Sequence, residues 1–91
     1  MPRLRTVQER VFRIEGFKVA FRHPDGRAMR GDRSGVPEYE YRRAAKDNIT
    51  VAAWKNQRFY PNYDGFGIEV LNGGGEPVPG KTFLSTVRGS Y

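Results

Sequence analysis

The chain contains no cysteine, only one histidine and no long apolar run. Without cysteine it can form no disulfide, no thiolate metal site and no thiol nucleophile. Its apolar runs fall short of the roughly 18–20 residues that a membrane-spanning helix needs. The basic N-terminus, MPRLRTVQERVF, lacks the apolar centre of a signal peptide. We therefore expect a cytoplasmic protein that does not bind a membrane.

The single histidine offers little for catalysis. His23 precedes Pro24 in an expected turn, and no Asp or Glu stands at a spacing that suggests a shared metal site. We therefore expect no enzymatic activity, no catalytic or metal-binding residue and no cofactor.

Positive charge is in excess, and it lies in the first half of the chain. The formal net charge is +6, and residues 1–46 hold twelve Lys and Arg against six Asp and Glu, whereas residues 47–91 hold four of each. A localised basic surface is typical of a protein that binds a polyanion, nucleic acid above all. The alternative is a solvated surface that serves solubility alone.

Two stretches of the chain repeat one pattern at a constant offset of 49 residues. GFKVAFRHPDGRAMRG (16–31) aligns without a gap on GFGIEVLNGGGEPVPG (65–80), and the glycines and alternating apolar positions coincide. Alternation with period two is typical of a half-buried strand, and His-Pro-Asp-Gly and Asn-Gly-Gly-Gly are typical of turns. Each stretch therefore predicts a β-hairpin. Apolar residues change phase between Ile14 and Phe17, which predicts a bulge or a break at Gly16.

The run GEPVPGKT (75–82) matches the phosphate-binding pattern G-x-x-x-x-G-K-[ST]. The first copy of the repeat keeps both glycines in GRAMRGDR without the Lys-Thr, so the hairpin explains them. Pro77 and Pro79 also remove two of the amide donors that a phosphate cradle uses. The nine residues after Thr82 favour a closing strand over the long helix of a P-loop. We expect no nucleotide site here.

Between the two copies the pattern becomes helical. Thr50 is a candidate N-cap before VAAWKNQRF, which should end before Pro61, and residues 38–47 are a weaker candidate helix. We predict an α+β fold with two similar β-hairpins, about 11–31 and 65–88, in an antiparallel sheet of four or five strands. One or two central helices, about 38–47 and 50–59, pack on one face. The length suits one domain over residues 1–91, with residues 1–10 as a flexible basic arm.

The stretch RRAAKDNITVAAWKNQRF (42–59) resembles a helix-turn-helix motif in its spacing. Asn48 stands at the turn, and Ile49 and Trp54 stand at the buried apolar pair. The resemblance implies that Lys55, Asn56 and Arg58 face phosphates or base edges of DNA. The alternative is two ordinary helices that pack on the sheet.

Aromatic and basic residues alternate in WKNQRFYPNY (54–63). Tyr60 or Tyr63 could stack on single-stranded bases. The alternative places Trp54 and Phe59 in the core, with the tyrosines at the edge of the sheet.

The function that these observations favour is non-enzymatic binding of nucleic acid, DNA in the first place, through the N-terminal arm and the first hairpin. The alternative is a small adaptor or inhibitor, such as an accessory protein of a mobile element, that binds an acidic protein. A homodimer through exposed strand edges is compatible with either function. The expected nucleic-acid contacts are Arg3, Arg5, Arg13, Lys18, Arg22, Arg27, Arg30, Arg33, Lys55 and Arg58.

Overall fold

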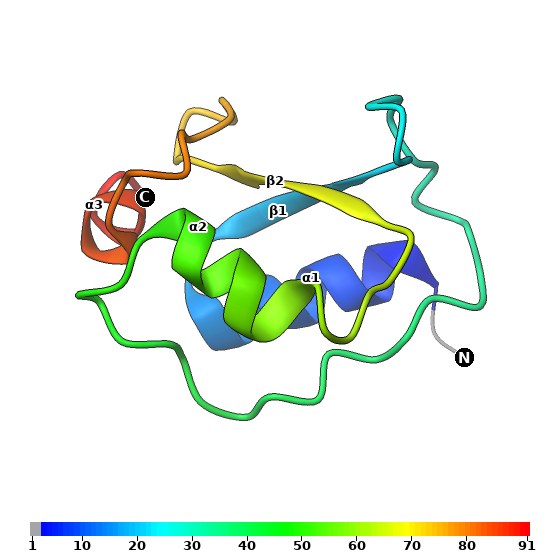
Figure 1. Cartoon of the computed structure of the whole chain (residues 1–91), viewed down its shortest axis with the longest axis horizontal. Helices are drawn as coiled ribbons and strands as arrows, with labels where there is room; N and C mark the ends of the chain where they lie inside the picture. Colours follow the sequence, from blue (N-terminus) through cyan, green and yellow to red (C-terminus); the bar gives the residue numbers. More distant parts are fainter. Residues whose placement is uncertain (1–2) are drawn as a thin grey trace.

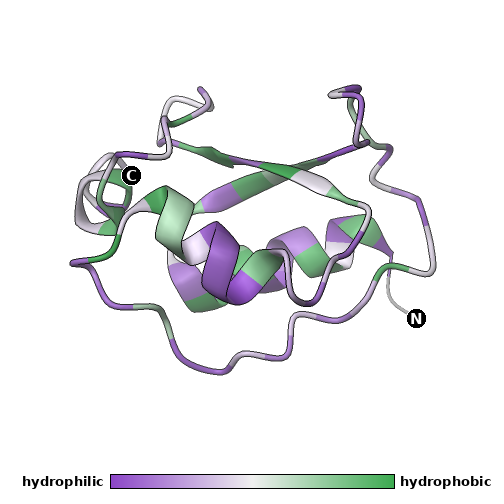
Figure 2. Ribbon diagram, in the orientation of Figure 1, coloured by the Kyte–Doolittle hydropathy of each residue, from purple (hydrophilic) through white to green (hydrophobic). Residues whose placement is uncertain are grey.

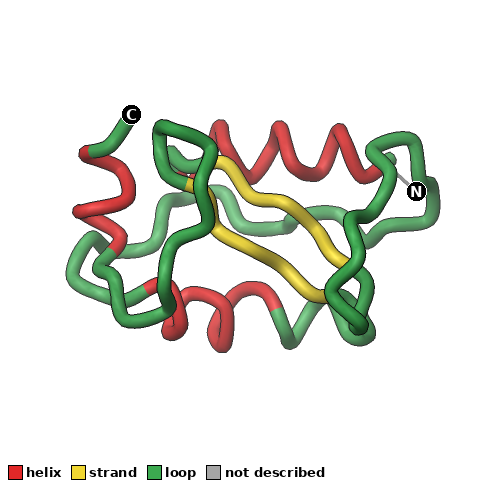
Figure 3. Tube along the Cα trace, turned by 90° about the horizontal axis from the view of Figure 1, so that it is seen from above, coloured by secondary structure: helices red, strands yellow, loops and turns green. Residues whose placement is uncertain are grey.

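A two-stranded antiparallel sheet lies over a layer of helices in the computed structural model, which describes residues 3–91 (Figure 1). The elements in chain order are α1 (Leu4–Glu15), β1 (Lys18–Arg22), α2 (Val51–Trp54), the π-helix η1 (Lys55–Phe59), β2 (Gly67–Leu71) and α3 (Leu84–Gly89). Seen from above the sheet, α1 runs along the side of β1, and α2 with η1 runs along the side of β2 (Figure 3). The α+β class and an antiparallel sheet are confirmed, with two strands in the sheet.

The N-terminal segment is a helix, where we expected an arm and the start of a strand. Leu4, Val7 and Val11 are buried at helical spacing, and both hydrophobic (green) and hydrophilic (purple) segments recur along α1 in Figure 2. Gly16 ends the helix in the left-handed conformation (φ 83°), and its amide bonds to the Phe12 carbonyl at 2.9 Å. The predicted strand from residue 11 is therefore wrong, and of the bulge or break expected at Gly16 the chain has the break. The change of phase at Gly16 marks the boundary between helix and strand.

The 49-residue repeat corresponds to two similar units of helix, strand, turn and return segment. Each strand leads into a turn whose glycine has positive φ, +91° at Gly26 and +81° at Gly75. A residue with a side chain rarely adopts this conformation, which explains why glycine stands at both positions. The return segments each make one bridge to their strand, Arg22 with Ala28 and Leu71 with Pro77. The two predicted hairpins therefore have the expected turns but no second strand.

The two units face each other across an approximate two-fold axis. The register pairs Ala20 with Glu69, its own counterpart at the offset of 49, and pairs Val19 with Val70. A register centred on a pair of counterparts is what a two-fold axis through the sheet requires. The sheet is therefore formed between the units, with one strand from each.

Each unit also caps the start of its own helix. The first two helical amides donate to two carbonyls of the return segment, 2.8–2.9 Å away: Leu4 to Arg33 and Arg5 to Gly31 in the first unit, Val51 to Thr82 and Ala52 to Gly80 in the second. These carbonyls stand at counterpart positions of the repeat. They satisfy amides that have no partner within the helix. In GEPVPGKT, the carbonyls of Gly80 and Thr82 thus serve as a cap for α2.

The helix predicted over 50–59 is confirmed, and its second half is a π-helix. The Thr50 side chain accepts the Ala53 amide at 3.2 Å as an N-cap. Farther along, the Tyr60 amide bonds to the carbonyl of Lys55, five residues earlier, at 2.9 Å. In an α-helix, residues five apart point about 140° away from each other. The wider turn lets Trp54 and Phe59 both enter the core, where they are 0% and 1% exposed.

The connection between the units is irregular, so the predicted helix over 38–47 is wrong. It passes beneath the helices as a long loop (Figure 1). Side chains hold its backbone: Arg10 Nε donates to the Tyr39 carbonyl at 2.7 Å, and the Ala45 amide donates to Glu15 Oε1 at 2.9 Å. These distant partners replace the bonds that a helix would make within itself. Without a first helix, the helix-turn-helix interpretation is also wrong.

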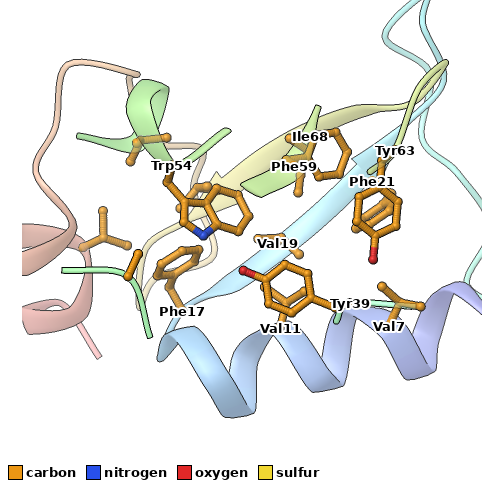
Figure 4. Close-up of a cluster of buried hydrophobic side chains, with 14 of the residues drawn as sticks. Val7, Val11, Phe17, Val19, Phe21, Tyr39, Trp54, Phe59, Tyr63 and Ile68 are labelled. Carbon is orange, nitrogen blue, oxygen red and sulfur yellow. The ribbon is translucent and has the colours of Figure 1, made fainter. Parts of the chain in front are cut away.

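The six largest fully buried side chains in the described chain are aromatic, and they lie in the core between the sheet and the helices (Figure 4). Trp54 meets Phe17 edge to face at 5.1 Å, and Phe21 meets Phe59 and Tyr63 in the same way at 5.3 Å. Such arrangements suit the ring quadrupoles. Trp54 and Phe59 are therefore core residues. Tyr63 is buried too, so only Tyr60 of the two tyrosines is open to a base.

The C-terminal segment forms α3, where we expected a closing strand up to residue 88. Leu84 and Val87 are buried one helical turn apart. The Leu84 amide bonds to the Ile49 carbonyl at 2.9 Å, which anchors the start of α3 to the connection. No helix within residues 3–91 is long and apolar enough to cross a membrane.

Candidate functional site

Four of the predicted contact residues meet at the start of α1. Arg3 is its N-cap residue and Arg5 lies in its first turn. The bonds from the Leu4 and Arg5 amides to the return segment bring residues 30–33 alongside. The Arg5 side chain lies beside Gly31, 3.8 Å from the position that a Cβ would take there. We call Arg3, Arg5, Arg30 and Arg33 the arginine cluster, and all four are exposed.

The second unit forms the same backbone arrangement without these arginines. The helix starts align Leu4 with Val51, and the repeat aligns residues 23–33 with 72–82. Residues 3–5 and 23–33 hold five arginines and two aspartates, whereas residues 50–52 and 72–82 hold one lysine and one glutamate. The counterparts of the cluster are Thr50, Ala52, Pro79 and Thr82. The local fold therefore forms without arginine at these positions.

Few counterions neutralise the positive charge of the arginine cluster. Arg30 pairs with Asp32 at 3.2 Å, but both side chains are more than half exposed, and such pairs are worth about 0–1 kcal/mol. The Arg33 guanidinium lies over the Phe66 ring, 5.2 Å from its centre. In the described part of the chain, Arg3, Arg5 and Arg33 have no ion pair. The positive end of the α1 dipole adds to their field.

Two other predicted residues of the first unit have local counterions. Arg27 pairs with Asp25 at 2.6 Å in the first turn. Arg22 pairs with Glu69 across the two strands at 3.1 Å and is mostly covered. The structure places Arg22 on the sheet rather than in the cluster.

Arg13 and Lys18 lie toward the other end of α1. Ten residues separate Arg13 from Arg3, or about 15 Å along a helix. Both side chains are exposed, and the Lys18 ammonium lies 5.6 Å from the centre of the Phe12 ring. Both positive charges therefore lie outside the arginine cluster.

Lys55 and Arg58 lie on η1 and are not brought to the cluster. Burial lowers the pKa of Lys55, against the opposing effect of the Glu69 charge. Arg58 donates to Glu15 Oε2 at 2.8 Å and to the Arg43 carbonyl at 2.5 Å. Burial would lower the pKa of Arg58, but the bond to Glu15 and its charge outweigh burial and raise it. Arg58 therefore holds the fold together.

Glu15 is a fully buried carboxylate that our sequence analysis missed. Its oxygens accept from four groups: the Tyr39 hydroxyl, the Ala45 amide (2.9 Å), Arg58 (2.8 Å) and Arg88 (3.3 Å). Arg88 also pairs with Asp47 at 2.5 Å. The carboxylate thus joins α1, the connection, η1 and α3. Its place on the apolar stripe of α1, four residues after Val11, is the signal that could have revealed it.

Among residues 3–91, no three His, Asp or Glu side chains gather in a way that could hold a metal ion. No family model, no curated protein and no solved structure matches the chain. Its function must therefore be inferred from the arrangement of its own residues.

Proposed function

We propose that the protein binds nucleic acid without catalysis, and that the arginine cluster holds the phosphates. One observation carries this proposal: the cluster stands in one unit only, on a backbone that the other unit builds without it. Arginines that the fold does not need, and that repel one another, are accounted for by a ligand of opposite charge. Arginine suits phosphate because its guanidinium donates two parallel hydrogen bonds.

The experiment is a titration of labelled duplex and single-stranded DNA, followed by fluorescence anisotropy at several salt concentrations. The variant replaces the cluster: Arg3→Thr, Arg5→Ala, Arg30→Ser and Arg33→Thr. Three of these are the residues that the second unit carries at the same positions, so we expect the variant to fold. The log–log salt slope for duplex should fall by about 0.9 for each phosphate that the variant no longer neutralises, or about 3.6 for all four arginines.

A matched control removes four other exposed positive charges, with Arg42, Arg43, Lys46 and Lys81 changed to serine. Equal reductions of the slope in the two variants would show that net charge alone attracts the DNA, which contradicts a site at the cluster. No binding of either probe by the native protein at about 50 mM salt would reject the proposal. The acidic protein partner would then be the function to test.

A further inference from the structure

A groove of about 220 Å³ runs between α1 and the sheet. One wall is a stripe of α1, and the other comes from the strands: Arg5, Gln8, Glu9 and Phe12 face Lys18 and Leu71. Arg5 belongs to the arginine cluster, so the groove starts at the cluster. Phe12 lies seven residues farther along α1, about 10 Å away.

An exposed aromatic pair lies at the far end of this groove. The rings of Phe12 and Tyr91 are 5.7 Å apart, and the two residues are 40% and 45% exposed. The Tyr91 hydroxyl donates to the Leu71 carbonyl at 2.6 Å and accepts the Lys18 amide at 2.7 Å. The hydroxyl is thus inserted between the two strands at the end of the sheet. It fixes the ring in place while leaving much of it open to solvent.

The second unit again offers an internal comparison. Because Leu4 and Val51 start the two helices, Phe59 is the counterpart of Phe12. The π-helix turns Phe59 into the core, where it is 1% exposed, whereas α1 is regular and leaves Phe12 outside. At this position of the helix, the aromatic ring is therefore exposed in the first unit and buried in the second, where the next residue, Tyr60, is the exposed one.

We propose that the ligand is single-stranded nucleic acid, lying along this groove with phosphates on the cluster and one or two bases stacked on Phe12 and Tyr91. This inference rests on the proposed function. Positive charge beside exposed aromatic rings is the combination that binds single strands, because phosphates and unpaired base faces both find partners. A duplex cannot use the rings, since its bases are already stacked on both faces. Between the cluster and the rings, Gln8 Oε1 accepts the Phe21 amide at 3.1 Å, which leaves the Gln8 NH2 group and the Glu9 carboxylate for the base edges.

The test compares a labelled oligothymidylate of about a dozen nucleotides with a labelled duplex of equal length. The variant carries Phe12→Ala and Tyr91→Ala. The control carries Tyr60→Ala and Phe83→Ala, which removes one exposed tyrosine and one exposed phenylalanine elsewhere. Fluorescence of the buried Trp54 checks that all of the proteins are folded. Should Tyr91→Ala alter the fold, Phe12→Ala alone gives the same comparison, because Phe12 makes no bond across the sheet.

We expect the native protein to prefer the single strand. The Phe12/Tyr91 variant should bind it about 5-fold to 150-fold more weakly, with unchanged affinity for duplex, while the control binds like the native protein. Equal or tighter binding of duplex, or an unchanged affinity of the variant for the single strand, would overturn the inference. The proposed function survives that result if the arginine variant still loses its binding. If neither probe binds the native protein, both proposals fail.

Discussion

Replacing Glu15 with glutamine is expected to lower the free energy of unfolding by about 3 kcal/mol, because it leaves buried positive charge without its counterion. Glu15 is the one carboxylate paired with Arg58 in the described chain, and it also pairs with Arg88. Breaking a buried pair costs about 3–5 kcal/mol. We expect a loss at the lower end of this range because the side chains of Arg58 and Arg88 are still 20% and 18% exposed to solvent. Urea denaturation followed by Trp54 fluorescence measures the change.

The matched control for this variant is Glu69→Gln. It removes the carboxylate of the Arg22–Glu69 pair, whose side chains are 29% and 38% exposed, so the expected decrease in stability is under about 1 kcal/mol. In a chain of this length, the Glu15 variant should also melt about 12–24 °C lower. If both variants are destabilised by the same small amount, the desolvation of Glu15 already offsets its attraction to the arginines, and the carboxylate is not what holds the four segments together.

Sequence patterns correctly predicted those parts of the fold that depend on residues close together in the chain. Turn glycines and alternating residues identified both strands and both turns, because positive φ and period two leave a direct trace in the sequence. Thr50 identified the start of α2 in the same way. The N-terminal helix was missed because Phe12 and Ile14 imitate the alternation of a strand. The spacing of Leu4, Val7 and Val11 was the competing signal, and burial of that stripe under the sheet decided the outcome.

The connection could not be predicted because distant groups hold it. Its backbone bonds to Arg10, Glu15 and Arg58, which are 15–30 residues away along the chain. No local sequence pattern reveals such distant partners. The helix predicted over residues 38–47 rested on local sequence alone. The structural role of Arg58 was missed for the same reason. Its partner Glu15 is also far away along the chain, and only the packing of α1 brings the two side chains together.

For the candidate site, the sequence identified the arginines as candidate contacts, but only the structure shows which of them lie together. The arginines stood out by charge, but only the cap on α1 shows that Arg3 and Arg5 meet Arg30 and Arg33. Tyr91 had no recognisable role, because its position depends on α3, which the sequence did not predict. The repeat proved the most useful pattern, since the second unit shows which features the backbone itself requires.

Above pH 10 the protein is expected to lose stability steeply, because two buried tyrosines resist ionisation. Burial raises the pKa of Tyr39, and its bond to the Glu15 carboxylate and the charge of Glu15 raise it further. Burial also raises the pKa of Tyr63, helped by the charges of Glu40 and Glu38. An unfolded tyrosine ionises near pH 10. The stability that these groups contribute is complete below that pH and is lost as the pH rises toward their folded pKa values, because only the unfolded chain releases the protons.

Each of the two tyrosines should lower the free energy of unfolding by about 1.4 kcal/mol per pH unit above pH 10, or about 5 kcal/mol for both by pH 12. Urea denaturation at a series of pH values measures this slope. Tyr63→Phe is the control because the Tyr63 hydroxyl has no hydrogen-bond partner in the described chain, so its removal should cost nothing at pH 7. Above pH 10, the free energy of unfolding of the Tyr63→Phe variant should fall with pH about half as steeply as that of the native protein. A native protein whose stability is the same at pH 9 and pH 11 would contradict the burial of both hydroxyls. A variant with the full slope would contradict the burial of Tyr63 alone.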